Sequence, residues 1–181
     1  MSLGEGAAVF ILETEEAARA RGHEPLCTNW LRHDQRRQGP CAPDLEGASN
    51  SIVLALEDAE MAPQEIHYVN AHGTATHAND ITEAEAILRV FGDYGQAVPV
   101  SSTKPIHGHA LGASGSLELV ITIQALREQI APPTINFVER DPKCPLDVVP
   151  NVARKHKIDA AMSNSFAFRR INAVLIVRHA A

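Results

Sequence analysis

The 181-residue chain carries 16 lysines and arginines against 22 aspartates and glutamates, a formal charge of −6, which disfavours a nucleic-acid-binding surface. Its composition, 45% apolar and 21% charged, is typical of a globular domain, and no apolar run approaches the ~20 residues of a membrane span. Cys27, Cys41 and Cys144 include no C-x-x-C pair, which disfavours zinc and disulfide frameworks. With no export signal at its start, the sequence predicts a cytoplasmic protein.

Apolar patterning in the first quarter of the chain predicts strands and helices in alternation. Residues 6–13 form a short apolar run and are predicted to be a buried strand. A helix follows, with Thr14 placed to cap it and Gly22 placed to end it. Residues 24–33 are interpreted as another strand, and the polar stretch 34–44, with its glycine and prolines, as an exposed loop.

The remaining three quarters continue the alternation. The sequence predicts helices at 45–61, 79–92 and 108–128, strands at 66–69, 97–103, 159–168 and 171–178, and a rigid turn at 132–137. The third helix is apolar on nearly every side, so it is expected to be buried on most faces. The pattern predicts an α/β layered fold with a largely parallel sheet, and one lobe spanning residues 1–181.

Three polar loops each follow a predicted strand: residues 70–76 ("NAHGTAT"), 101–109 ("SSTKPIHGH") and 163–168 ("SNSFAF"). In open α/β sheets, sites form beyond the carboxyl ends of the strands. The three loops are therefore expected to converge on one pocket.

Basic side chains stand out in these loops. Taken alone, His72 is as consistent with an ordinary core or surface histidine as with a functional one, although the flanking Gly73 would allow a ligand to approach closely. Lys104 and His109 lie five residues apart, and His109 falls at the start of the predicted apolar helix. The positive end of a helix dipole disfavours a protonated imidazole, and a neutral one can donate a hydrogen bond to a developing oxyanion.

Four stretches, "VNAHGTAT", "SSTKPIHGHALGASG", "PPTIN" and "SNSFAF…NAVLIVR", together resemble the carboxyl-terminal half of β-ketoacyl-[acyl carrier protein] synthases. The resemblance covers nearly the whole chain, and its strongest signal is H-G-T followed by K-x-x-x-G-H. It implies half of a thiolase-like layered fold, a mixed sheet flanked by helices with a buried central helix. It also implies the decarboxylative Claisen condensation of malonyl-carrier protein with an acyl thioester, as in fatty-acid and polyketide synthesis.

The resemblance assigns roles to individual residues. His72 and His109 match the two histidines that face the malonyl thioester carbonyl, and Lys104 matches the lysine that orders the site. Thr74 and Thr76 match threonines that bind the phosphopantetheine arm of the acyl carrier protein. Phe168 matches the gating phenylalanine of the oxyanion hole. The remaining matches form a cluster that in some relatives holds a monovalent cation or an ordered water: Asn70, Glu83, Glu118, Ser163 and Asn164. No tightly bound cofactor is implied.

Two features depart from the family pattern. The family's nucleophilic cysteine belongs to the amino-terminal half, and none of Cys27, Cys41 and Cys144 has a context that would lower a thiol pKa. The glycine pair that usually follows the gating phenylalanine is replaced by Arg169 and Arg170. We therefore expect little condensing activity from the chain alone.

Alternative interpretations remain open at this point. The chain is also consistent with a non-catalytic partner subunit, similar to a chain-length factor, or with a truncated remnant. A thiolase is disfavoured because no cysteine lies beyond Cys144. The expected partners are acyl carrier protein, an amino-terminal half or full-length synthase, and a second copy of the chain, since a lone half-fold exposes apolar surface. Neither nucleic acid nor a membrane is expected as a partner.

Overall fold

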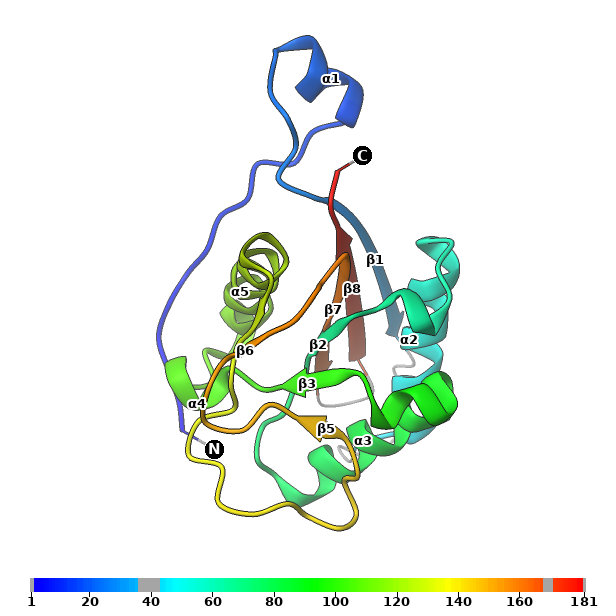
Figure 1. Ribbon diagram of the computed structural model, residues 1–181, viewed down its shortest axis with the longest axis vertical. Helices are drawn as coiled ribbons and strands as arrows, with labels where there is room; N and C mark the ends of the chain where they lie inside the picture. Colours follow the sequence, from blue (N-terminus) through cyan, green and yellow to red (C-terminus); the bar gives the residue numbers. More distant parts are fainter. Residues whose placement is uncertain (1, 36–42, 168–170, 181) are drawn as a thin grey trace.

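The structure is a computed structural model that describes residues 2–35, 43–167 and 171–180 (Figure 1). Cys41 and the predicted gate, Phe168 with Arg169 and Arg170, lie outside the described residues. Within the described part of the chain, no helix is long and apolar enough to cross a membrane.

Within the described ranges, one six-stranded mixed sheet organises the molecule. Its spatial order is β1 (Thr28–Gln35), β8 (Ile171–Arg178), β7 (Ala160–Ala167), β2 (Tyr68–Asn70), β3 (Pro99–Ser101) and β5 (Asp147–Val148). The run β7-β2-β3-β5 is parallel, whereas β1-β8-β7 is antiparallel. The predicted parallel arrangement is thus confirmed for β7-β2-β3-β5 only, because the last two strands, β7 and β8, pair directly with each other in antiparallel orientation. A separate two-stranded ladder joins β4 (Ile130–Ala131) and β6 (Arg154–Lys155).

Helices cover both faces of this sheet (Figure 1). On one face lie α2 (Leu45–Asp58) and α3 (His77–Phe91), and on the other lies α5 (Ser114–Glu128). Short helical turns complete the chain: η1 (Pro63–Glu65), η2 (Gly92–Gln96), α4 (Lys104–His107) and η3 (Leu111–Ala113). The predicted helices at 45–61 and 79–92 are therefore confirmed, with ends displaced by at most three residues.

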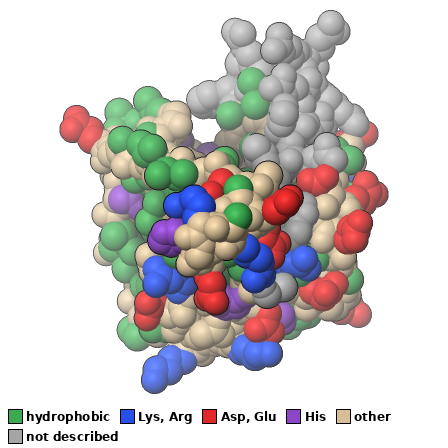
Figure 2. Space-filling view, turned by 90° about the horizontal axis from the view of Figure 1, so that it is seen from above, with side chains coloured by type: hydrophobic (Ala, Val, Ile, Leu, Met, Phe, Trp, Pro, Cys, Tyr) green, Lys and Arg blue, Asp and Glu red, His purple; other side chains and the backbone are tan. Residues whose placement is uncertain are grey.

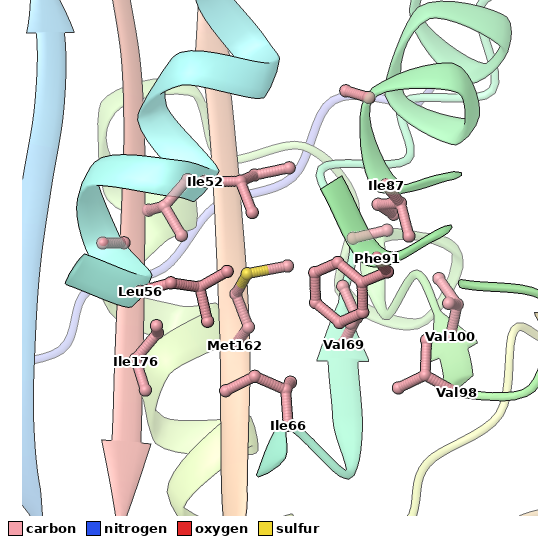
Figure 3. Close-up of a cluster of buried hydrophobic side chains, with 14 of the residues drawn as sticks. Ile52, Leu56, Ile66, Val69, Ile87, Phe91, Val98, Val100, Met162 and Ile176 are labelled. Atoms are coloured by element: carbon pink, nitrogen blue, oxygen red, sulfur yellow. The ribbon is translucent and has the colours of Figure 1, made fainter. Parts of the chain in front are cut away.

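Alternating strand residues supply two cores. Val69 and Met162 point to the α2/α3 side and pack with Ile52, Leu56 and Phe91 (Figure 3). Their chain neighbours Tyr68 and Ala161 point to the α5 side and pack with Leu126 and Ile158. Successive side chains on a strand face opposite sides of the sheet, so a run that is apolar at every position is buried on both faces.

The predicted strand at 6–13 is wrong for this chain. These residues form an extended arm that has no strand partner among the described residues, and Val9 and Ile11 are 93% and 90% exposed. The arm runs past α5 to α1 (Glu15–Ala20), outside the main sheet (Figure 1). Thr14 caps α1 as predicted, its hydroxyl oxygen accepting from the Ala17 N–H at 3.2 Å.

The predicted helix at 108–128 is shorter than expected. Gly108, at φ +75°, ends α4, and η3 intervenes before α5 begins at Ser114. α5 is buried on one side only: Leu119, Ile123 and Leu126 face the sheet, whereas Val120 on the opposite side is 38% exposed. Its expected burial on most faces is therefore not realised within the described chain.

Candidate active site

Two neighbouring strands, β2 and β3, end at the same level of the sheet, beside the middle of β7. Asn70 on β2 pairs in register with Ser101 on β3 and with Ser163 on β7. Because these strands are parallel, the polar segments that follow β2 and β3 leave the sheet from adjacent points on one edge. The predicted convergence on one pocket is confirmed for residues 70–76 and 101–109, which both contribute to the lining of one cleft. The third predicted loop is wrong for its described part, because residues 163–167 belong to β7 and do not line that cleft.

Glu83 fixes the loop that carries His72. From α3, its carboxylate accepts the backbone N–H groups of His72 at 2.8 Å and Gly73 at 2.9 Å, and the Asn164 amide at 3.0 Å. Gly73 is required at this turn because it has φ +39°, and a Cβ there would lie 2.5 Å from the Ser102 Cβ. Glu83 thereby ties the loop to α3 and β7, and His72 within the loop is only 9% exposed.

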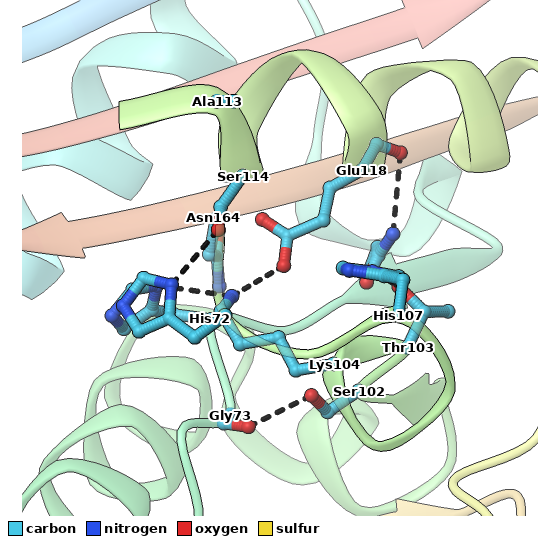
Figure 4. A network of polar contacts seen from close by, with 12 residues as sticks. His72, Gly73, Ser102, Thr103, Lys104, His107, Ala113, Ser114, Glu118 and Asn164 are labelled. Atoms are coloured by element: carbon cyan, nitrogen blue, oxygen red, sulfur yellow. Dashed lines mark hydrogen bonds and ion pairs between the residues drawn. The ribbon is translucent and has the colours of Figure 1, made fainter. Parts of the chain in front are cut away.

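Lys104 connects His72 to α5. Its Nζ forms an ion pair with Glu118 Oε1 on α5 and lies 3.4 Å from His72 Nδ1 (Figure 4). Lys104 and Glu118 are 5% and 0% exposed, so the pair is almost completely removed from solvent. An ammonium group can only donate, so His72 Nδ1 accepts and the ring proton resides on Nε2.

His109 stands beside His72 at the start of the buried helix. The two ring centroids are 5.7 Å apart, with the rings nearly perpendicular at 85°. His109 Nδ1 lies 2.8 Å from Ser114 Oγ on the first turn of α5. The His109 backbone donates to the Ser2 carbonyl at 2.8 Å and accepts from Gly4 N–H at 3.1 Å. The sequence placed His109 on the helix; the structure places it five residues before α5, with its ring against the helix start.

Burial and nearby positive charge keep both imidazoles neutral. Burial, then Lys104 and then His109, lowers the pKa of His72 to about 3. The pKa of His109 is also lowered, by burial first and then by Lys104 and His107. Burial raises the pKa of Glu118, and the charge and hydrogen bond of Lys104 oppose that rise. Neutral imidazoles can donate a hydrogen bond to an oxygen that becomes negative without first losing a proton.

A cleft of about 1040 Å³ opens next to these groups. Lys104, His109 and Thr74 contribute polar lining, and the residues on either side of His72 also line it. Thr74 and Thr76, the predicted pantetheine contacts, share a hydrogen bond between their hydroxyls at 2.9 Å. Residues 134–141 form the opposite wall, which sequence reasoning missed. The apolar Ile135, Phe137 and Val138 within "TINFVERD" were the available signal.

The supporting cluster leaves several oxygens without partners. Among the described residues, Asn70 Oδ1, Asn164 Oδ1 and Glu118 Oε2 are buried and accept no hydrogen bond. The Asn70 amide donates to the Glu118 carbonyl and to Thr122 Oγ1, both at 3.3 Å, and Ser163 is buried alongside on β7. Oxygen acceptors of this kind suit a hard cation or a buried water. No group of three or more His, Cys, Asp and Glu side chains in the described ranges is placed to hold a metal ion.

Neither described cysteine has the character of a nucleophile. Burial raises the pKa of the Cys27 thiol. Burial, followed by the charge of Asp141 and other nearby acids, raises the pKa of Cys144 to about 11. Both thiols are therefore protonated near neutral pH, and the sequence-based view that neither accepts an acyl group is consistent with this structure.

Comparison with known proteins identifies the family. Residues 28–138, more than half of the chain, match the model of "Beta-ketoacyl synthase, C-terminal domain". The chain belongs to the β-ketoacyl synthase family. Curated relatives of this β-ketoacyl synthase domain include the 3-oxoacyl-[acyl-carrier-protein] synthase 2 of Coxiella burnetii, 44% identical over 97% of this chain and 43% of the relative. Nodulation protein E of Rhizobium sp. strain N33 is also 44% identical, over 97% of this chain and 44% of the relative.

Solved structures confirm the thiolase-like fold of this β-ketoacyl synthase domain. One described as "The ishigamide ketosynthase/chain length factor" superposes with a TM-score of 0.90 at 40% identity, covering 99% of this chain and 44% of that one. A β-ketoacyl synthase from Burkholderia phymatum STM815 gives a TM-score of 0.86 at 38% identity, over 92% of this chain and 40% of the other. The chain thus spans less than half the length of the relatives it matches.

Proposed function

We propose that the chain is the carboxyl-terminal part of a β-ketoacyl-[acyl carrier protein] synthase that catalyses decarboxylative Claisen condensation. One observation carries this proposal: two neutral imidazoles, with ring centroids 5.7 Å apart, lie beside a buried Lys104–Glu118 pair at the carboxyl ends of the parallel strands β2 and β3. A cleft open to substrate adjoins them. The name of the Coxiella burnetii relative supports the same activity.

The site's chemistry suits the decarboxylation step. When a malonyl thioester loses carbon dioxide, the electron pair of the broken C–C bond passes into an enolate, and negative charge develops on the thioester oxygen. His72 and His109, each donating through Nε2–H, would stabilise that charge. Lys104 would hold His72 in this tautomer through Nδ1 and keep the ring neutral. The enolate carbon then attacks an acyl thioester held on a cysteine of the amino-terminal half, and that thiolate leaves.

Acyl carrier protein is the proposed donor of substrate, carried on its phosphopantetheine arm, and no tightly bound cofactor is required. Thr74 lines the cleft and bonds to Thr76, so both hydroxyls stand at one side of the entrance to the histidines. A solved relative, 31% identical and with a TM-score of 0.87, is described as a type II polyketide synthase acyl-carrier protein in complex with its ketosynthase. Phe168, as the gate, belongs to the same proposal. We place the reaction in the cytoplasm, where free thiols such as Cys27 and Cys144 persist.

The amino-terminal half of a synthase is the proposed partner of the exposed arm and of α5. Val9, Ile11 and Leu12 on the arm are exposed, as is Val120 on the outer side of α5. Gly6 lies against the Leu117 side chain, so the arm and the helix form one continuous surface. Figure 2 shows hydrophobic side chains gathered toward the left, the side on which Figure 1 draws the arm and α5. Without that half, we expect the chain to self-associate through this surface, which light scattering across a concentration series would detect; a monomer throughout would contradict it.

A monovalent cation or an ordered water is the proposed occupant of the cluster beneath the site. The three unpartnered buried oxygens of Asn70, Asn164 and Glu118 support this, because an unsatisfied buried acceptor is costly. Glu83 would contribute indirectly by holding Asn164. Such an occupant would fix Glu118, and through it the position of Lys104.

A partner subunit similar to a chain-length factor is the second candidate. The ishigamide relative is described by both names, ketosynthase and chain length factor. Against this function stands the complete set of His72, Lys104 and His109 with its supporting contacts. A subunit that performs no chemistry gives no reason to keep two neutral imidazoles facing each other.

Reconstitution with an amino-terminal half tests the proposal. The chain would be co-expressed with residues preceding the matched region of the Coxiella burnetii synthase, and the complex supplied with acyl- and malonyl-acyl carrier protein. We expect β-ketoacyl-acyl carrier protein by mass spectrometry, and its loss in His72→Ala and His109→Ala. A stable complex that forms no product would overturn the catalytic assignment. So would a complex whose product formation survives both substitutions.

A further inference from the structure

We propose that Ser114 is a positioning residue: its hydroxyl donates to Nδ1 of His109 and thereby fixes the imidazole proton on Nε2, toward the cleft. The contact is 2.8 Å between Ser114 Oγ and His109 Nδ1, and its direction decides what the ring can do. A ring protonated on Nε2 can donate to a substrate oxygen. A ring protonated on Nδ1 would present only a lone pair there.

The surroundings of Ser114 favour donation by the hydroxyl. Ser114 is buried, and within the described chain its Oγ has no hydrogen-bond partner other than His109. If Oγ instead accepted from Nδ1–H, the hydroxyl proton would be left in the interior without an acceptor, which is unfavourable. Donation to Nδ1 uses that proton and leaves only lone pairs unmatched.

The backbone of His109 is held independently of its ring. The Ser2–Gly4 segment bonds to both the N–H and the C=O of His109, and Leu3 forms a parallel bridge with it. The ring is therefore left to rotate about its side-chain bonds, and Ser114 is the group that selects one orientation and one tautomer. Nε2 has no hydrogen-bond partner among the described residues, and the residue lines the cleft.

A matching arrangement exists at His72. There Lys104 donates to Nδ1 and leaves the proton on Nε2. The two imidazoles thus reach the same protonation pattern by different donors, one charged and one neutral. Under the proposed function, on which this catalytic reading rests, two N–H groups would point at one developing oxyanion.

Nitrogen NMR on the chain labelled with ¹⁵N-histidine tests the tautomer directly. Long-range ¹H–¹⁵N spectra at pH 7.5 distinguish a protonated ring nitrogen from a bare one, and His109→Gln assigns the signals. We expect His109 to carry its proton on Nε2. Ser114→Ala should raise the population of the Nδ1–H tautomer about fivefold, equivalent to about 1 kcal/mol for one neutral hydrogen bond. Ser114→Thr should restore the wild-type pattern.

Ser116→Ala is the matched control. Ser116 lies two residues further along α5, and its hydroxyl bonds to the Ala113 carbonyl rather than to His109. A wild-type proton on Nδ1, or His109 nitrogen shifts that Ser114→Ala leaves unchanged in a folded protein, would overturn the inference. In the reconstituted synthase, Ser114→Ala should lower kcat severalfold with KM unchanged. A tautomer change in a complex without any condensing activity would refute the proposed function and leave the tautomer assignment intact.

Discussion

The buried Lys104–Glu118 pair gives the sharpest test of the site's electrostatics. Lys104→Met keeps the aliphatic bulk but leaves Glu118, which is 0% exposed, without its ion-pair partner. An isolated buried carboxylate becomes protonated rather than remaining charged. At pH 7 this means protonating a group whose unfolded pKa is 4.5, at about 1.4 kcal/mol per pH unit over about 2.5 units. Relative to a variant that carries no carboxyl at this position, the expected cost at pH 7 is about 3.5 kcal/mol.

The sign of the pH dependence follows from the same argument. In Lys104→Met the folded pKa of Glu118 lies above the unfolded value, so the folded state binds the extra proton and gains stability as the pH falls toward 4.5. Lys104→Met/Glu118→Gln carries no such carboxyl. The free energy of unfolding of the double variant should exceed that of the single variant by up to about 3.5 kcal/mol at pH 7 and by less than about 1 kcal/mol at pH 5. Effects of the lost lysine on His72 are common to both variants and cancel.

Urea unfolding followed by circular dichroism at the two pH values measures this difference. Equal midpoints for the single and double variants at pH 7 would refute the reasoning. So would a gap of the same size at pH 5, because the penalty would then not arise from proton uptake by Glu118.

Three further predictions concern His72, the close approach of the Gly4 backbone to residues 107–109, and the isolated chain. Because the folded pKa of His72 is about 3 and its unfolded value is 6.5, the wild type should lose stability relative to His72→Gln as the pH falls from 6.5 toward 3, by about 1.4 kcal/mol per unit; parallel pH profiles would contradict this. A Cβ at Gly4 would lie 2.1 Å from the His107 carbonyl oxygen, so Gly4→Ala should cost about 1–3 kcal/mol and shift the His109 ring signals. Gly112→Ala, whose Cβ would meet nothing within 4 Å, is its control and should change stability by less than about 0.5 kcal/mol; equal effects of the two would argue against a steric origin. Finally, the chain alone should elongate acyl-acyl carrier protein no faster than its His72→Ala variant, since no described thiol has a lowered pKa; a faster rate by mass spectrometry would show that a nucleophile is present.

Local signals account for the predictions that were confirmed. Thr14 caps α1 through its own side chain, and Gly92 ends α3 at φ +57°, a conformation that glycine adopts without strain. The spacing of Ile52 and Leu56 gives α2 its buried side. The polar segments after β2 and β3, together with the resemblance to β-ketoacyl synthases, were also sufficient to predict that His72, Lys104 and His109 would meet.

Long-range effects account for the errors. The arm at 6–13 has a strand's composition, yet a strand forms only where another edge is available, and none lies beside it in the described chain. The long helix was predicted to start at Gly108, but Gly108 at φ +75° ends α4, and the backbone of His109 bonds to Ser2 and Gly4 instead of continuing a helix. Apolar periodicity does not report such contacts between distant segments. The wall at 134–141 was missed because only the fold brings it opposite His109.

By itself, the sequence determined the type and order of most elements and the chemical groups available to the site, because caps, glycines and periodicity act over a few residues. Only the tertiary structure decided which nitrogen of each imidazole is free and how far burial moves its pKa. Those properties depend on Ser114, on Glu118 through Lys104, and on the hydrogen bonds of Ser2–Gly4 to the His109 backbone. All of these are contacts between separate segments of the chain. Packing sets these distances, and a hydrogen bond or a desolvated charge depends on distance far more steeply than on residue order.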